Sequence, residues 1–138
     1  MPAPRSTKGG TRGTVYREIA RQRLADAKSL LDHARFNGAI YLAGYAIECH
    51  LKFAVCKRND AIYMPANLEV QDWERHVAAA GLAADIKAQR PMALIYYGLA
   101  EQWGPALRYP TANYSVSEAS ILYKEMHALY HFLKELAP

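Results

Sequence analysis

The sequence predicts an all-α protein, an antiparallel bundle of four long helices plus a short one. Two observations support this class. Apolar residues recur at spacings of three and four, the period of a helix, and no stretch alternates between apolar and polar residues as a strand would. The chain has 138 residues, which suits a single domain that can bury a core without disulfides or metals.

The first thirteen residues form a basic tail. They hold three glycines and two prolines, and Arg5, Lys8 and Arg12 without any acid, so we expect disorder over 1–13 and one domain over 14–138. The remaining 14 Lys and Arg face 13 Asp and Glu. The domain itself is therefore nearly neutral, and the net charge of +4 is weak evidence for a nucleic-acid surface.

The first helix is expected to begin near Thr14, a suitable N-cap residue. Its core stripe is Tyr16, Ala20, Leu24, Ala27, Leu31 and Ala34. The pair Asn37-Gly38 is expected to end this helix, since glycine suits the left-handed C-cap position. The short turn predicts that the next helix packs antiparallel to the first.

The second helix, which ends near Arg58, is apolar nearly all round and is expected to be the buried centre of the domain. A helix turns about 100° per residue, so Tyr41, Tyr45, Glu48 and Lys52 share one narrow stripe. Two interpretations stay open. Glu48 and Lys52 pair with each other in the favoured i,i+4 orientation, or the stripe faces a ligand, a partner subunit or a loop.

The same helix bears on the cellular compartment. Cys49 and Cys56 lie about 10.5 Å apart along it, too far for a disulfide, which predicts a reduced, cytoplasmic chain. The apolar stretch 39–55 is short for a membrane span and contains three polar or charged residues, so we expect no membrane association.

Local signals predict the later helices. Asp72 is expected to cap a short helix that Gly81 ends, and Pro91 suits the first turn of a helix running to about residue 102. Ser115 and Glu118 have the spacing of a capping box that starts the last helix. The core stripe of that helix is Leu122, Met126, Leu129, Leu133 and Leu136.

The irregular stretch 104–114 is the leading candidate for ligand binding, since a loop of this size in a compact domain is often functional. Arg108 can hold a phosphate together with the nearby Asn113 amide, and Tyr109 and Tyr114 can stack on a base. Alternatively, Arg108 pairs with Glu48 or a backbone carbonyl and fixes the loop. The candidate ligand-binding residues are Tyr45, Glu48, Lys52, Arg108, Tyr109, Asn113 and Tyr114.

The last helix carries two histidines, His127 and His131, at a spacing that can chelate a metal. No third ligand is placed near them by the sequence, so we expect neither a metal site nor a cofactor. The stripe that His127 shares with Tyr123, Tyr130 and Lys134 is interpreted as a helix–helix or subunit contact.

Three features together resemble the HEPN family (higher eukaryote and prokaryote nucleotide-binding domains). They are the pattern Ala46-Ile47-Glu48-x-x-x-Lys52, the preceding helix ending at residue 38, and Trp103 followed by Leu107-Arg108-Tyr109-Pro110 and a long last helix. The resemblance covers roughly 16–136. It implies a HEPN-like bundle, nucleotide or RNA binding, and a homodimer, which the surplus of aromatic and apolar residues also favours.

Ribonuclease members of that family have an Arg followed four to six residues later by a His, contributed by both subunits. No Arg of this chain has a His at that spacing, and Arg108 with five intervening residues reaches Tyr114. A tyrosine with a pKa near 10 is a poor general base at neutral pH. The departure therefore argues against catalysis.

Three functions follow. The first is a nucleotide- or RNA-binding dimer that resembles the HEPN partners of nucleotidyltransferases in prokaryotic toxin–antitoxin or defence systems. The second is a divergent, metal-independent ribonuclease that uses Arg108 and Tyr114. The third is a non-catalytic protein-interaction module.

Overall fold

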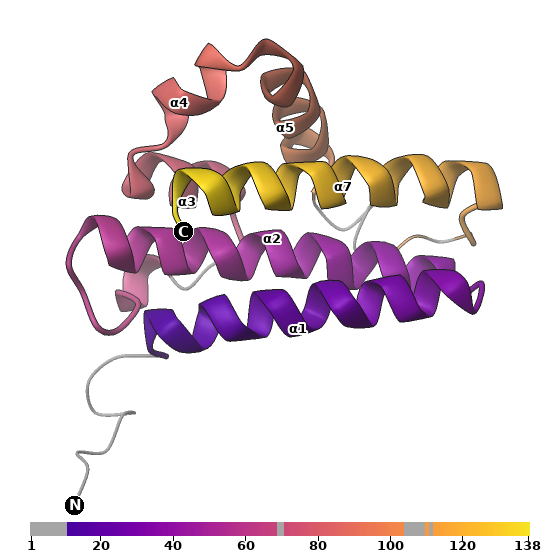
Figure 1. The fold of residues 1–138 in the computed structure, drawn as a ribbon, viewed down its shortest axis with the longest axis horizontal. Coiled ribbons are helices and arrows are strands. Elements are labelled where there is room, and N and C mark those ends of the chain that lie inside the picture. The colour runs from indigo at the N-terminus through magenta and orange to yellow at the C-terminus, as the bar shows by residue number, and fades with distance from the viewer. Residues whose placement is uncertain (1–10, 69–70, 104–109, 111) are drawn as a thin grey trace, which may run out of the picture.

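The protein is all-α in the computed structural model, which describes residues 11–68, 71–103, 110 and 112–138 (Figure 1). Within these ranges there is no strand, and Arg12 and Tyr63 form one isolated bridge. The helices are α1 (Gly13–Asp32), α2 (Phe36–Arg58), the 3-10 helix η2 (Ala66–Leu68), α3 (Trp73–Ala80), α4 (Ala83–Ala88), α5 (Arg90–Gln102) and α7 (Val116–Leu136).

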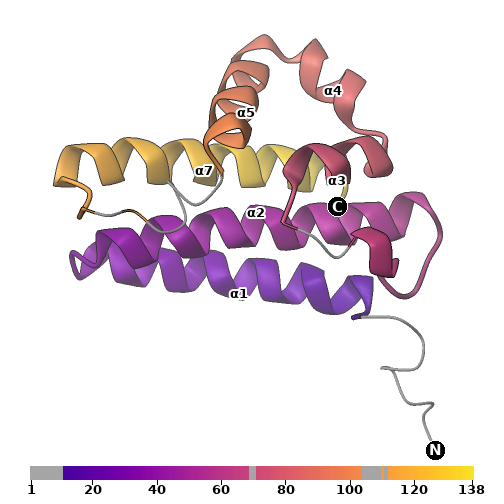
Figure 2. The same cartoon turned by 180° about the vertical axis from the view of Figure 1, so that it is seen from behind.

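The three longest helices, α1, α2 and α7, lie side by side with α2 in the middle (Figures 1 and 2). Helices α3, α4 and α5 lie on the side of α2 that faces away from α1. Helix α5 is steeply inclined to the long helices in both views. Contacts of α2 with α1, α7 and α3 dominate the packing. The core is therefore organised around α2.

Helices α2 and α7 run in the same direction, which corrects the expected antiparallel arrangement of four long helices. Asn37 at the start of α2 bonds to Asn113 and Tyr114 just before α7, and His50 further along α2 bonds to Ala137 just after α7. The parallel course is possible because the intervening segment with α3, α4 and α5 returns along the length of α2. Helix α1 is antiparallel to α2, as the short turn predicts.

Burial on all sides of α2 matches its apolar sequence. Fifteen of its 23 residues are buried, including both cysteines, which are free thiols. By length and composition α2 is the one described helix that passes as a candidate membrane span, yet 83% of its apolar window is buried inside the fold. That burial is what a core helix shows.

Most helix ends follow the local signals. The Asp72 side chain accepts a hydrogen bond from the backbone of Arg75 at 3.2 Å, and Gly81 is left-handed with φ 70°. Pro91 lies in the first turn of α5. Ser115 and Glu118 form both bonds of the capping box, at 2.9 and 3.1 Å.

The turn between α1 and α2 differs from the prediction. Helix α1 ends at Asp32, the left-handed residue is Ala34 with φ 58°, and Asn37 and Gly38 belong to the first turns of α2. Asn37 is engaged by the segment before α7. Gly38 allows a close approach, since a Cβ there would lie 3.2 Å from the Leu30 side chain.

Two further differences concern segments with weak local patterns. Helix α4 occupies a stretch that was not predicted to be helical, because six residues carry too few turns for a visible periodicity. Residues 1–10 of the expected tail lie outside the described residues. The next three are paired, with Met64 N–H donating to Thr11 C=O and Gly13 N–H to Ile62 C=O, both at 2.9 Å.

Candidate functional site

Glu48 and Lys52 form a buried ion pair within α2. Their side chains are 2% and 10% exposed, and Lys52 Nζ lies 3.5 Å from Glu48 Oε2. The same ammonium lies 5.2 Å from the centre of the Tyr16 ring of α1. The structure thus favours the interpretation in which the two residues pair with each other. Lys52 also links α2 to α1, because a cation over an aromatic face is attracted to the ring.

Tyr45 belongs to a row of aromatic rings that continues from α2 to α5. Tyr45 stacks on Tyr41 with ring centres 6.4 Å apart, Tyr41 contacts Trp103, Trp103 stacks on Trp73 at 5.4 Å, and Trp73 stacks on Tyr96. Burial, and secondarily the neighbouring Cys49, raises the pKa of Tyr45 to about 12. The phenol stays protonated, and this part of the stripe serves packing among the described residues.

Asn37 fixes the end of the candidate loop to the start of α2. Its amide nitrogen donates to Asn113 Oδ1 at 3.3 Å and to the Ala112 carbonyl at 3.5 Å, and its oxygen accepts from the Tyr114 N–H at 3.0 Å. A side chain that satisfies a backbone N–H in this way orders the segment it touches. Asn113 and Tyr114 are therefore held in place beside α2.

These residues line a cavity of about 630 Å³, which we call the loop cavity. Its polar and aromatic lining comes from Arg35, Phe36, Asn37, Asn113 and Tyr114. The volume lies in the range of small-ligand sites. Arg35 is exposed and forms no ion pair with a described residue, so its guanidinium is available to an anion. The cavity combines one cation, two amides and two rings.

Tyr114 is poorly suited to act as a base. Burial, followed by the nearby Glu118 carboxylate, raises its pKa above the ordinary value near 10. A phenol of that kind keeps its proton at neutral pH and can donate a hydrogen bond. The geometry is compatible with binding and adds a physical reason against proton abstraction by Tyr114.

The predicted site residues fall into two separate groups. Asn113 and Tyr114 meet near Asn37, whereas Glu48 lies eleven positions further along α2, roughly 16 Å away at 1.5 Å per residue. The structure does not bring these groups into one site. Arg108 and Tyr109 lie outside the described residues.

A groove between α1 and α7 was not predicted as a binding site. It has a volume of about 520 Å³ and ten lining residues, none of them acidic, and it includes the stripe that the sequence indicates as a helix–helix or subunit contact. His127 and His131 lie there with ring centres 4.4 Å apart. The described residues contain no group of three His, Cys, Asp or Glu that can hold a metal ion. The spacing of cations along the last helix is the one feature of the sequence that points to this groove. That cations of α1 face them follows only from the packing of the two helices.

Comparison of the chain with protein-family models, with curated proteins and with solved structures gives no match. The loop cavity and the groove between α1 and α7 are two hollows whose chemistry bears on function.

Proposed function

We propose that this protein binds RNA or nucleotides at the loop cavity, without catalysing cleavage. The observation that carries the proposal is that Asn113 and Tyr114, two residues expected to bind ligand, line one cavity with Arg35, Phe36 and Asn37. A HEPN-like fold, a homodimer and a cytoplasmic location belong to the same proposal. They rest on the sequence resemblance.

The chemistry of the cavity suits a single-stranded nucleotide. The Arg35 guanidinium can hold a phosphate through paired hydrogen bonds. The rings of Phe36 and Tyr114 offer surfaces on which an unpaired base can stack, and the Asn113 amide can bond to a base edge. Arg108 belongs to the same loop in sequence and is proposed as a second phosphate contact.

Loss of binding in targeted variants tests the proposal. Fluorescence anisotropy of an end-labelled single-stranded oligoribonucleotide is measured with wild type, Arg35→Ala, Arg108→Ala and Tyr114→Phe. Each Arg variant should weaken binding by about tenfold or more, as expected for a charged hydrogen bond of about 1.5–3 kcal/mol. Tyr114→Phe should have a smaller effect, because it removes one hydroxyl and keeps the ring.

Arg75→Ala is the matched control, because Arg75 is an exposed arginine on α3, away from the loop cavity. It should change affinity by less than about twofold, the scale of a neutral surface substitution. Equal losses in Arg75→Ala and Arg35→Ala would show non-specific charge attraction. Absence of any RNA or nucleotide binding would favour the alternative of a protein-interaction module.

Cleavage is tested separately in the presence of a metal chelator. Tyr114→His restores the Arg-to-His spacing of the ribonuclease members of the HEPN family. Wild type should leave the RNA intact. Wild type that cleaves as well as Tyr114→His, and loses cleavage in Arg108→Ala, would support the divergent ribonuclease instead.

Exposed apolar side chains on α5 and α7 are available for an interface in the proposed dimer. Leu94 and Tyr97 on α5 are 68% and 40% exposed, and Val116 and Ile121 on α7 are 65% and 58% exposed. Light scattering should give the mass of a dimer at micromolar concentration, and a monomer mass would contradict this part. A nucleotidyltransferase encoded beside this chain, and co-purifying with it, would support that class of protein partner.

A further inference from the structure

The groove between α1 and α7 concentrates positive charge. Among its lining residues are Arg21 and Lys28 from α1 and Lys124 and Lys134 from α7, and no acid lines it. Residues 14–138 as a whole carry a formal charge of only +1. Four cations and no acid therefore line this groove, although the domain is nearly neutral.

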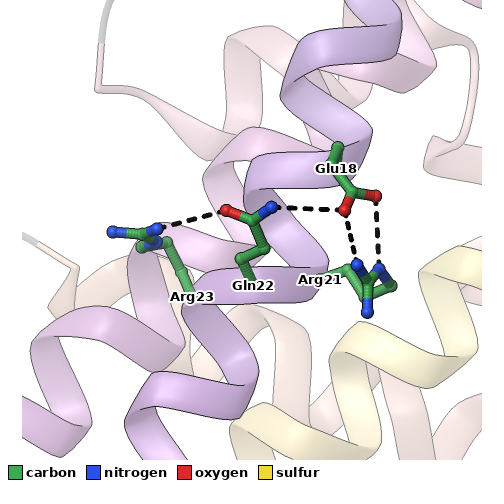
Figure 3. A network of polar contacts seen from close by, with 4 residues as sticks. All are labelled: Glu18, Arg21, Gln22 and Arg23. Atoms are coloured by element: carbon green, nitrogen blue, oxygen red, sulfur yellow. Dashed lines mark hydrogen bonds and ion pairs between the residues drawn. The ribbon is translucent and has the colours of Figure 1, made fainter.

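The cations on α1 are partly neutralised by neighbours outside the groove. The Arg21 guanidinium bonds to the Glu18 carboxylate, which also accepts a hydrogen bond from Gln22 (Figure 3). Lys28 Nζ lies 2.6 Å from Asp32 Oδ1. These exposed ion pairs hold the two cations at the groove wall, and they cancel only part of the positive potential that the cations create there.

The cations on α7 are not neutralised in this way. Lys124 and Lys134 form no ion pair with a described residue. Lys124, His127, His131 and Lys134 follow one another at spacings of three, four and three, so they form a single stripe along the helix. The two imidazoles lie at its centre, and their nitrogens make no hydrogen bond within the part of the chain that the structure describes.

The floor of the groove is apolar and aromatic. Leu24 of α1 and Tyr123 and Tyr130 of α7 line it, and all three are less than one-tenth exposed. Such a floor can receive the carbon skeleton or ring of a ligand while the stripe holds an anionic group. The volume of about 520 Å³ matches a small molecule.

We infer that this groove is a second binding site, for a small molecule that carries a phosphate group. The phosphate lies against His127 and His131, with Lys124 and Lys134 on either side of it. The inference does not depend on the proposed function, because the groove shares no lining residue with the loop cavity.

The electrostatics of the histidine pair predict how a phosphate bound there would change the pKa of His131. Loss of water around its ring, followed by the neighbouring His127 and Lys134, lowers the pKa of His131. Glu135 opposes this shift on α7, and the groups on α1 that face the groove are Arg21 and Lys28, with Glu18 and Asp32 behind them. A bound phosphate adds negative charge beside the imidazole, so it should raise that pKa again.

Calorimetry with adenosine 5′-monophosphate, adenosine and inorganic phosphate tests the inference on the full chain. The monophosphate should bind at least about tenfold more tightly than adenosine, because a charged hydrogen-bonding group contributes about 1.5–3 kcal/mol. Binding of inorganic phosphate alone would also support the site. Equal affinity for adenosine and its monophosphate, or no heat from either phosphate compound up to millimolar concentration, would overturn the inference.

Variants locate the site. Lys124→Gln with Lys134→Gln should weaken binding of the monophosphate by about tenfold or more, while Arg75→Gln with Lys87→Gln, which removes two charges from α3 and α4, should change it by less than about twofold. In Arg35→Ala, which weakens the loop cavity, the binding of the monophosphate that Lys124→Gln with Lys134→Gln removes should persist, and this separates the groove from the loop cavity. An unchanged affinity in the α7 variant, or its conversion of a dimer to a monomer, would assign the groove to another role.

A spectroscopic measurement provides a second readout. The pH titration of the His131 ring signals by NMR, with and without the monophosphate, should show a higher pKa in the bound protein. A pKa that stays the same or falls would contradict a phosphate placed against the imidazoles.

Discussion

Replacing Lys52 with methionine should destabilise this protein far more than its place in a simple i,i+4 pair indicates. The substitution keeps the length of the side chain and removes the charge. It leaves the carboxylate of Glu48, whose side chain is 2% exposed, without the ammonium group 3.5 Å away. It also removes the cation from the face of the Tyr16 ring.

The expected loss follows from burial. Two unit charges 3.5 Å apart attract by about 5 kcal/mol at an effective dielectric constant near 20, and the cost of desolvating them offsets part of this. We expect Lys52→Met to lower the free energy of unfolding by about 3 kcal/mol. With a slope of about 1.5 kcal/mol per molar urea, the midpoint falls by about 2 M.

Lys28→Met is the matched control. Lys28 and Asp32 form another i,i+4 pair, with a shorter Nζ–Oδ1 distance of 2.6 Å but side chains that are 56% and 53% exposed. An exposed pair contributes about 0.5 kcal/mol or less. Urea unfolding followed by far-UV circular dichroism, with a double-mutant cycle through Glu48→Gln, should give a much larger coupling for the buried pair. Coupling below about 0.5 kcal/mol for Glu48 and Lys52 would refute this reasoning and place the pair in solvent.

Two further predictions concern packing and pH. Gly44→Ala should destabilise the protein by about 1–2 kcal/mol despite the better helix propensity of alanine, because the new Cβ would overlap the Trp103 ring. Gly98→Ala should stabilise the protein by up to about 1 kcal/mol, since a Cβ there meets nothing within 4 Å. Thermal unfolding of the two variants measures both effects. His50 and His76 have pKa values that burial lowers, so the fold favours their neutral forms and the unfolded chain binds more protons below about pH 6.5. Urea unfolding should therefore show stability that holds above that pH and falls as the pH drops to about 5, with a smaller fall in His50→Gln or His76→Gln.

The helices could be predicted from the sequence because their signals are local. Asp72, Gly81 and the capping box of Ser115 and Glu118 act within four residues of themselves, so their chemistry is visible without knowledge of the fold. The same applies to the burial of α2, which an apolar surface on every side requires.

The direction of α7 and the turn before α2 could not be predicted without the three-dimensional structure. The pair Asn37-Gly38 has the composition of a helix end, yet the structure uses Asn37 as a clamp on residue Tyr114, 77 positions away. Amide side chains serve equally well as caps and as long-range hydrogen-bond partners. Sequence alone cannot distinguish these roles when the partner segment is distant.

The candidate sites divide in the same way. Asn113 and Tyr114 were identified from loop composition and line a cavity, but its cation, Arg35, comes from the turn after α1 and was not singled out. The pairing of Glu48 with Lys52 follows from helical spacing. The groove required α1 and α7 to be placed face to face, because neither helix alone has more than a common charged stripe.

The central claim, that RNA or nucleotides bind at the loop cavity, is tested most directly by following backbone amide signals in NMR during titration with a single-stranded oligoribonucleotide. The account predicts that the signals of Asn37, Asn113 and Tyr114 shift with one common saturation curve while those of α4 stay in place. The Asn37 side-chain amide should move with them, since it holds that segment. Shifts confined to other parts of the chain, or no shift at saturating RNA, would contradict the claim.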